Sequence, residues 1–187
     1  MTTVKQTECL NGVDVARLKG TLAAIRRDET LASFQFRLTN RWQGGSHNQS
    51  GIRGFYGTQQ QHEHPHPFSL DNDEPEVLLG DDEFPNPVEY LLHALAGCVT
   101  TTMVCHAASR GIEIESIEST LEGDIDLRGF LGLSDEVPRG FKQIRVTMRV
   151  KSDAPPDKLA ELAKFSPVFS TITRATPVSV NVEPAAE

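Results

Sequence analysis

Three cysteines are the residues of this chain best suited to redox or nucleophilic chemistry: Cys9, Cys98 and Cys105. A thiolate is the form that attacks a peroxide oxygen or a disulfide sulfur. The count is odd and no C-x-x-C pair occurs, which argues against a structural disulfide framework. Cys98 and Cys105 are seven residues apart in one predicted helix, about 10 Å along its axis, which is too far for a disulfide. We therefore expect reduced thiols.

Alternating histidines form a second group whose chemistry deserves testing. His62, His64 and His66 would share one face of a strand and would then point toward a common metal ion. Two prolines alternate with them and interrupt a strand ladder, and no further ligand follows at the spacing of a known metal site. We therefore expect residues 59–67 to form a solvated turn that binds no metal.

A long helix over residues 86–110 must position Cys98. It opens with an Asn-Pro pair and stops at Gly111, which are helix start and stop signals. At about 100° per residue, a stripe of small and apolar side chains shares the face of Cys98, and we expect that stripe to be buried. Its members are Leu91, Ala94, Leu95, Thr102, Cys105 and Ser109. Gly97 weakens the helix by about 1 kcal/mol, so we expect a neighbour packed close to Cys98.

The chain before this helix predicts a helix followed by a hairpin. Residues 11–28 show helical spacing with Asn11 as the cap, and from Ser33 the apolar residues alternate as in a strand. Gly44 and Gly45 form a turn signal, and residues 51–60 return as a second strand. A short strand is expected at residues 77–79, after an acidic loop.

The chain after the central helix predicts two paired strands, a helix and a last strand. Residues 117–127 alternate with one acidic face, and residues 144–151 alternate with a basic one, so the two strands can lie side by side. A helix follows Asp153, and residues 178–182 read as a final strand. This order predicts an α+β fold in a single domain, residues 1–187, in which residues 1–32 are an N-terminal helical extension.

Composition narrows the classes of partner. The 187 residues are 38% hydrophobic, enough for one core, and a net charge of -8 without a basic block argues against nucleic acid. No apolar run of about 18 residues is expected to span a membrane. The first residues lack the apolar segment of a signal peptide, so a cytoplasmic location is expected.

The motifs, taken together, resemble the OsmC/Ohr family. The resemblance extends from about Phe34 to Val182 and rests on NPVEYLLHALAGC, the glycine-ended helix, the EGDIDL strand, the basic strand and FSPVFSTI. It implies an α+β fold of antiparallel sheets with a long central helix, in an intertwined homodimer. It also implies an activity, the reduction of organic hydroperoxides by a thiolate that becomes a sulfenic acid and is resolved by a second cysteine.

Compared residue by residue, this chain keeps only some of the family's catalytic residues. Cys98 falls on the peroxidatic cysteine, but the place of the resolving cysteine, before Pro167, holds Ser166. The family's glutamate would follow the Asn-Pro pair directly, where this chain has Val88, and the nearest acid is Glu89. Glu89 lies about 180° from Cys98 on an ideal helix, so we expect it to act mainly as a favourable charge at the helix N-terminus.

The family's arginine would follow the double glycine of the hairpin, where this chain has Ser46. Arg41 and Arg53 are the nearby arginines that would replace it beside the thiolate. The candidate catalytic residues are therefore Cys98, Glu89, Arg53 and Arg41, with no cofactor and no metal.

Two functions follow from the resemblance. The first is thiol-dependent reduction of organic hydroperoxides through Cys98 in oxidative stress defence, with an external thiol reductant in place of the second cysteine. The alternative is a catalytically inactive relative that binds a small apolar ligand in the cavity of the dimer. Both involve a homodimer.

Overall fold

The computed structural model describes residues 9–174 and 176–183 of the chain. Its elements in chain order are β1 (Cys9–Leu10), β2 (Val13–Asp14), α1 (Val15–Arg27), η1 (Glu29–Ala32), β3 (Gln35–Phe36), β4 (Thr39–Gly44), β5 (His47–Gly57), β6 (Gln60–Asn72), η2 (Glu76–Leu78), α2 (Pro87–Ser109), β7 (Ser116–Asp124), α3 (Leu127–Phe130), β8 (Gln143–Lys151), α4 (Pro156–Ala163) and α5 (Pro167–Thr173). The structure combines helices with sheets whose strands all pair antiparallel, which confirms the predicted α+β class.

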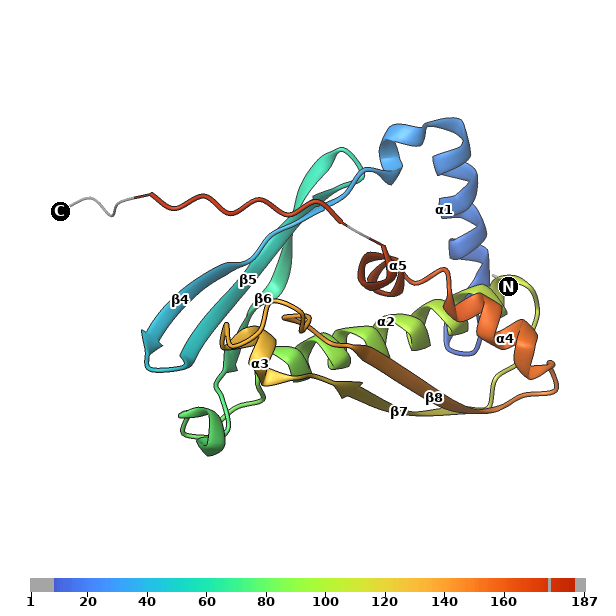
Figure 1. Ribbon diagram of the computed structural model, residues 1–187. Coiled ribbons are helices and arrows are strands. Elements are labelled where there is room, and N and C mark those ends of the chain that lie inside the picture. Colours follow the sequence, from blue (N-terminus) through green and yellow to red (C-terminus); the bar gives the residue numbers. More distant parts are fainter. Residues whose placement is uncertain (1–8, 175, 184–187) are drawn as a thin grey trace, which may run out of the picture.

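The helical body forms around α2, which runs along the β7–β8 ribbon with α5 on its other side (Figure 1). Met103 and Ala107 of α2 meet Leu159 and Leu162 of α4 in the buried core. These side chains lie at helical spacing on their own elements, so each helix contributes one apolar stripe. The core therefore sits at the crossing of α2 with α4 and the ribbon.

The ends of α2 are set by local signals, as the sequence predicts. The side chain of Asn86 accepts a hydrogen bond from the backbone N–H of Glu89, and the Glu89 carboxylate accepts one from the N–H of Asn86, which together form a capping box. At the other end Gly111 has a φ of 69°, a left-handed conformation that glycine adopts without strain.

The buried stripe of α2 differs from the predicted one. Leu95, Val99, Met103 and Ala107 are buried, whereas of the stripe expected around Cys98 only Leu95 is. The helix is rotated because its contact surface is set by α4 and the β7–β8 ribbon. A Cβ placed on Gly97 would meet no atom within 4 Å. Among the described residues, none therefore packs closely on Gly97 as the sequence predicted.

By length and composition α2 is apolar enough to cross a membrane, so the expectation that the chain has no such run was wrong. A single helix of this kind is weak support for a membrane segment, since core helices of soluble proteins meet the same criterion. In this fold the helix supplies Met103 and Ala107 to the buried core.

Asn11 does not cap α1, so that prediction was wrong. The side chain of Asp14 caps α1. Asn11 instead donates its amide to the carbonyl of Ile112 at 2.9 Å and accepts from the N–H of Ile114 at 2.9 Å. The β1–β2 turn is thereby tied to the loop after α2, a contact between residues 101 and 103 positions apart in the chain. Residues 1–8 of the expected N-terminal extension lie outside the described residues.

The second sheet is centred on β5. β3 and β4 pair antiparallel with successive parts of β5 along one edge, and β6 pairs along the other. Gly44 and Gly45, both with positive φ, lie at the turn between β4 and β5, so the predicted hairpin is confirmed. Its second strand was predicted at residues 51–60 but spans His47–Gly57. In Figure 1 this sheet extends away from the helical body.

The tract with alternating histidines is part of β6, so the expected turn was wrong. The pairing with β5 passes from Ile52–Phe68 to Gly54–Glu63 and skips residues 64–67. Both prolines of the tract fall in this bulge, where no ladder hydrogen bond is required of them. A bulge thus accommodates prolines in a long strand.

Three further expectations were wrong. Residues 77–79 belong largely to the 3-10 helix η2, and the predicted strand 117–127 ends at Asp124, because the side chain of Asp126 caps α3. Residues 178–182 form no strand and their valines are almost fully exposed. A strand requires a neighbour for its backbone groups, and the described part of this chain provides none there.

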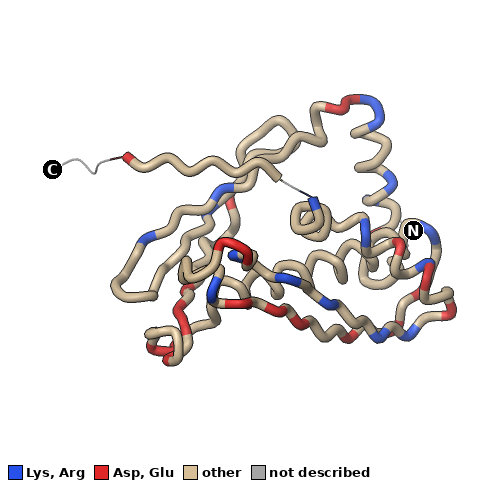
Figure 2. The backbone as a smooth tube through the Cα atoms, viewed as in Figure 1, with Lys and Arg blue, Asp and Glu red and all other residues tan. Residues whose placement is uncertain are grey.

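The β7–β8 pairing confirms that an acidic strand lies beside a basic one. Glu118 is opposite Arg149 and Glu122 is opposite Arg145, and Figure 2 shows the two signs of charge along neighbouring strands. Arg145 also binds Asp124. Because these groups are exposed, solvent screens the ion pairs and each contributes little to stability.

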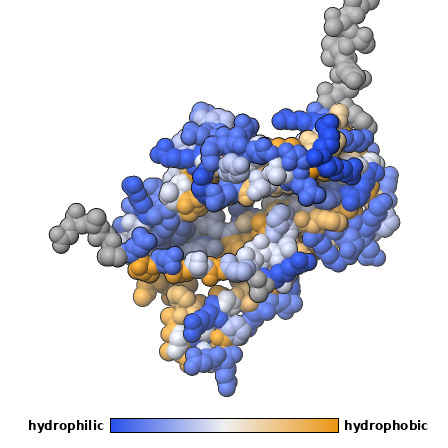
Figure 3. Space-filling view, turned by 90° about the horizontal axis from the view of Figure 1, so that it is seen from above, coloured by the Kyte–Doolittle hydropathy of each residue, from blue (hydrophilic) through white to orange (hydrophobic). Residues whose placement is uncertain are grey.

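The sheet around β5 exposes its apolar face. Phe36 is 75% exposed and Trp42 is 71% exposed, and Phe34, Leu38, Phe68 and Leu70 are exposed as well. The rings of Phe34, Phe36 and Phe55 stack on one another with centroids 5.5–6.2 Å apart. Figure 3 shows apolar side chains along one edge of the upper surface and around a hollow near its centre. The described residues of one chain therefore leave the apolar surface of this sheet uncovered.

Candidate functional site

Cys98 lies in the middle of α2 and is half-buried. It sits between Val99, which is buried in the core, and Gly97, which is exposed. All three cysteines are free thiols, as expected, and Cys98 and Cys105 remain separated within one unbroken helix. Cys98 therefore lies at the boundary between the buried and the exposed face of α2.

Glu89 lies in the first turn of α2, nine residues before Cys98, about 13 Å along the axis. Its carboxylate completes the capping box with Asn86. A negative charge at this end is also favourable with the helix dipole. The structure thus gives Glu89 the N-terminal role that its position predicts, within its own chain.

The two candidate arginines lie on the hairpin. Arg41 is on β4 opposite Gln49, and Arg53 is on β5, and both are exposed. Within residues 9–174 and 176–183, no hydrogen bond or ion pair joins Cys98 to either arginine or to Glu89. One chain does not bring the predicted catalytic set together.

Ser166, at the position of the resolving cysteine, is fully buried and caps α5. Its hydroxyl oxygen accepts a hydrogen bond from the backbone N–H of Phe169 at 3.1 Å. A serine here stabilises the start of a helix and offers no sulfur for a disulfide.

His106 is the histidine nearest to the cysteine helix face, and its ring is held in place. Burial, reinforced by the charge of Arg110, lowers the pKa of His106. The Arg110 guanidinium lies 2.9 Å from Nδ1, and the ring stacks on Phe165 with centroids 4.5 Å apart. The Nδ1 atom therefore accepts from Arg110. Neutral His106 supports the end of α2.

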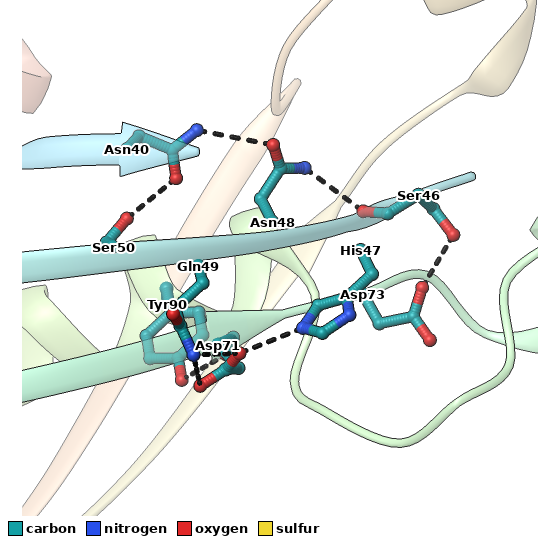
Figure 4. A network of polar contacts seen from close by, with 9 residues as sticks. All are labelled: Asn40, Ser46, His47, Asn48, Gln49, Ser50, Asp71, Asp73 and Tyr90. Carbon is teal, nitrogen blue, oxygen red and sulfur yellow. Dashed lines mark hydrogen bonds and ion pairs between the residues drawn. The ribbon is translucent and has the colours of Figure 1, made fainter. Parts of the chain in front are cut away.

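A polar network that the sequence did not reveal joins the hairpin turn to α2 (Figure 4). His47 Nε2 lies 2.8 Å from a carboxylate oxygen of Asp71, and Gln49 donates to the same carboxylate at 3.2 Å. The Tyr90 hydroxyl donates to the Asp71 backbone carbonyl at 2.7 Å. The ring of His47 stacks on Phe84 at 5.1 Å. Three distant segments of the chain meet here.

A second carboxylate lies beside this network. Asp73 is 3% exposed and accepts hydrogen bonds from the Ser46 hydroxyl at 2.5 Å and the Asp81 N–H at 3.0 Å. The Ser46 hydrogen bond, followed by that from the backbone of Glu74, lowers the pKa of Asp73 to about 2. At the position where the resemblance implies an arginine, this chain has Ser46, whose hydroxyl donates to the Asp73 carboxylate.

The sequence contained one signal for this network. Asp71 and Asp73 are two residues apart at the end of β6, where acidic side chains meet the hairpin turn. The residues GGSHN by themselves predict only a turn, because nothing local shows that a turn and the end of a later strand lie side by side. The β5–β6 pairing creates that contact.

The alternating histidines have structural contacts. His62 stacks on Phe55 with centroids 4.9 Å apart, and His64 packs against Phe55 and Phe68. His62 Nε2 also lies 3.0 Å from the Gly57 carbonyl. Among the residues whose positions are described, no group of three His, Cys, Asp or Glu side chains is arranged to hold a metal ion.

An apolar cavity of about 600 Å³ lies between α2, β8, α4 and α5. Val99 and Met103 line it from α2, Met148 from β8 and Leu159 from α4. Asp157 and Lys164 also line it. Its volume is within the range of small-molecule sites.

Comparison with known proteins identifies the family. A model described as OsmC-like protein matches residues 80–181, more than half of the chain. No curated protein sequence matches the chain significantly. Among solved structures, an OsmC-like protein from Mycoplasma pneumoniae is similar with a TM-score of 0.54 at 15% identity, over 74% of this chain and 87% of that one.

Two further structures are similar. An osmotic stress induced and detoxification response protein from Psychrobacter arcticus has a TM-score of 0.51 at 16% identity, over 73% of this chain and 88% of the other. An OsmC-like protein of unknown function from Vibrio cholerae has a TM-score of 0.50 at 11% identity, over 73% and 92%. At these identities the structures show a shared fold. With the sequence match over residues 80–181, they establish that the chain belongs to the OsmC-like protein family.

Proposed function

We propose that the protein reduces organic hydroperoxides through Cys98 with an external thiol as reductant. The observation that carries this proposal is the half-buried free thiol of Cys98, next to the exposed Gly97 on α2, in a chain of the OsmC-like family. The similar protein from Psychrobacter arcticus is named for a detoxification response. Because the residue is partly exposed and its neighbour Val99 is buried, we propose that a small peroxide reaches the thiol from the open side of the helix.

The reaction balances with two thiols. The Cys98 thiolate attacks the terminal oxygen of the hydroperoxide, so that an S–O bond forms and the O–O bond breaks. Cys98 becomes a sulfenic acid, and the departing alkoxide takes up a proton and leaves as an alcohol. The first external thiol reduces the sulfenic acid to a mixed disulfide and releases water. The second attacks the external sulfur of that disulfide, which releases Cys98 and a small-molecule disulfide. Ser166 takes no part.

The protein is proposed to act as a homodimer. Large apolar side chains are exposed on the β5 sheet, the Gly97 side of α2 is open, and the valines of residues 178–182 are exposed. A second copy would cover these surfaces and would bring another hairpin toward Cys98. We propose that its Arg41 stabilises the thiolate, because a thiolate needs a nearby cation at mid-helix. Arg53 remains the second candidate.

The test uses two matched cysteine variants. Cys98→Ser should abolish turnover of cumene hydroperoxide with a dithiol, whereas Cys105→Ser, two helical turns away, should retain nearly all of it. Mass spectrometry after peroxide treatment should show Cys98 as sulfenic acid, a more oxidised acid or a mixed disulfide. Wild-type protein that shows no turnover with any dithiol, and a Cys98 that alkylates no faster than free cysteine, would exclude the peroxidase.

The alternative function is binding of a small apolar ligand without catalysis. The observation in its favour is the apolar cavity beside Val99 and Met103, which is large enough for such a ligand. A fluorescent apolar probe should then bind wild-type protein, and Met148→Lys should weaken that binding while Val77→Lys, on an exposed site outside the cavity, should not. If neither variant changes probe binding, the cavity is not the site.

A further inference from the structure

One arginine of β5 pairs with neither of the strands that flank β5, because the pairing is interrupted on both edges at this point. Along one edge, β3 pairs up to Phe36–Phe55 and β4 starts again at Thr39–Gly51, so residues 37 and 38 do not pair. Along the other edge, the β6 pairing skips residues 64–67. Arg53 is the residue of β5 between these two interruptions.

A pocket of about 380 Å³ occupies this break. Arg37 and Arg53 line it together with Gln61, His62 and Glu63. The two β5 glycines on either side of Ile52 and Arg53 leave it room, and at Gly54 an added Cβ would lie 2.3 Å from the His62 carbonyl oxygen. The pocket therefore depends on a backbone approach that only glycine permits.

The arginines of this pocket are not neutralised by contact with carboxylates. Arg37 donates to the side-chain oxygen of Gln61, a neutral amide. Over the described ranges 9–174 and 176–183, Arg53 has no hydrogen bond or ion pair, and Glu63 lies in no ion pair with either arginine. Elsewhere in this acidic chain Arg145 holds Asp124 and Glu122.

The chemistry of the lining selects an oxyanion. A guanidinium presents parallel N–H donors that match two oxygens of a carboxylate or phosphate. His62 directs Nε2 to the Gly57 carbonyl and the Thr58 hydroxyl, so its ring serves as a wall. Glu63 and the net charge of -8 disfavour highly charged ligands.

We propose that this pocket binds the carboxylate or phosphate group of a small molecule, with Arg53 as the principal donor and Arg37 as the second. Gln61 orients the Arg37 guanidinium. Cys98 does not line this pocket, and among the described residues of one chain no hydrogen bond or ion pair joins Arg53 or Arg37 to it. Anion binding by the pocket does not depend on the proposed peroxidase activity.

The experiment is isothermal titration calorimetry of the full chain with inorganic phosphate and, separately, with succinate, at constant ionic strength set with chloride. Wild-type protein should bind at least one of them with a Kd on the order of 1 mM. Phosphate binding alone identifies a phosphate ester as the ligand class, and succinate binding alone identifies a carboxylate.

Variants decide whether the pocket is responsible. Arg53→Gln should weaken anion binding about tenfold or more, and Arg37→Gln should weaken it less. The affinity of Arg53→Lys should fall between those of wild type and Arg53→Gln, because lysine keeps the charge but lacks the paired N–H donors of the guanidinium. Arg41→Gln is the matched control, since Arg41 is an exposed arginine on neighbouring β4 that does not line the pocket. It should bind as wild type does.

Two results would overturn the proposal. One is the absence of heat of binding for both anions at about ten times the expected Kd. The other is equal weakening by Arg41→Gln and Arg53→Gln, which would indicate general attraction to a basic surface. If circular dichroism shows that Arg53→Gln does not fold, the anion affinities of Arg53→Lys and Arg37→Gln are compared with that of Arg41→Gln instead.

Discussion

The helical body buries its apolar residues, whereas the β5 sheet leaves many of its apolar residues exposed. In the body, Met103, Leu159 and Leu162 are buried within one chain. In the sheet, Phe36 is 75% exposed and packs against the rings of Phe34 and Phe55. The family match over residues 80–181 covers the body and leaves out the sheet.

This difference separates two sources of stability. The body buries an apolar core of its own, at about 25 cal/mol for each Å² removed from water. The sheet forms hydrogen-bond ladders along both edges of β5. It nevertheless keeps a large apolar surface in water, which monomeric proteins rarely do. We infer that the body contributes most of the stability of the single chain, and that the sheet contributes to contact between chains.

The largest expected effect concerns the core of the body. Leu162→Ala removes a side chain that is 4% exposed and should lower the free energy of unfolding by about 2–5 kcal/mol. Urea denaturation followed by circular dichroism measures it. Leu79→Ala, at a site that is 93% exposed, is the control and should stay within about 0.5 kcal/mol of wild type. Equal effects of the two variants would contradict the comparison.

The next effect concerns association. Phe36→Ser should shift the protein from dimer toward monomer in sedimentation velocity at micromolar concentration, because it removes an exposed ring from the face that a second copy would cover. Val77→Ser, on η2 and also exposed, should leave the distribution unchanged. A wild-type protein that sediments as a stable monomer would refute the assigned role of the sheet.

A smaller effect is expected at the start of α2. Asn86→Ala removes the capping box and should cost about 1 kcal/mol of unfolding free energy. Asn86→Asp keeps an oxygen acceptor and should recover most of the loss. If both variants unfold at the same urea concentration as wild type, the cap contributes nothing to the body.

The smallest effect is a pH dependence at the junction of the two regions. The folded pKa of Asp73 is lowered to about 2, from 3.8, so its contribution to stability is present above pH 3.8 and is lost as the pH falls toward 2. Asp73→Asn should remove this part of the acid dependence in unfolding experiments between pH 5 and 2. Glu76→Gln, an exposed carboxyl on η2, should keep the wild-type profile.

The sequence by itself determined the elements whose causes are local. The Asn-Pro start and Gly111 stop bound α2 correctly, and the alternating charges place β7 beside β8, because caps and side-chain periods act within a few residues. The position of Cys98 in a helix, and its separation from Cys105, follow from the same local geometry.

The tertiary structure decided what depends on distant neighbours. The neighbours of α2 select the buried stripe through Val99 in place of the one through Cys98, and a bulge against β5 lets the prolines of β6 lie in a strand. The same pairing brings His47 to Asp71, 24 positions away. Packing energy arises from surfaces that meet only in the folded chain, so no local pattern contains it.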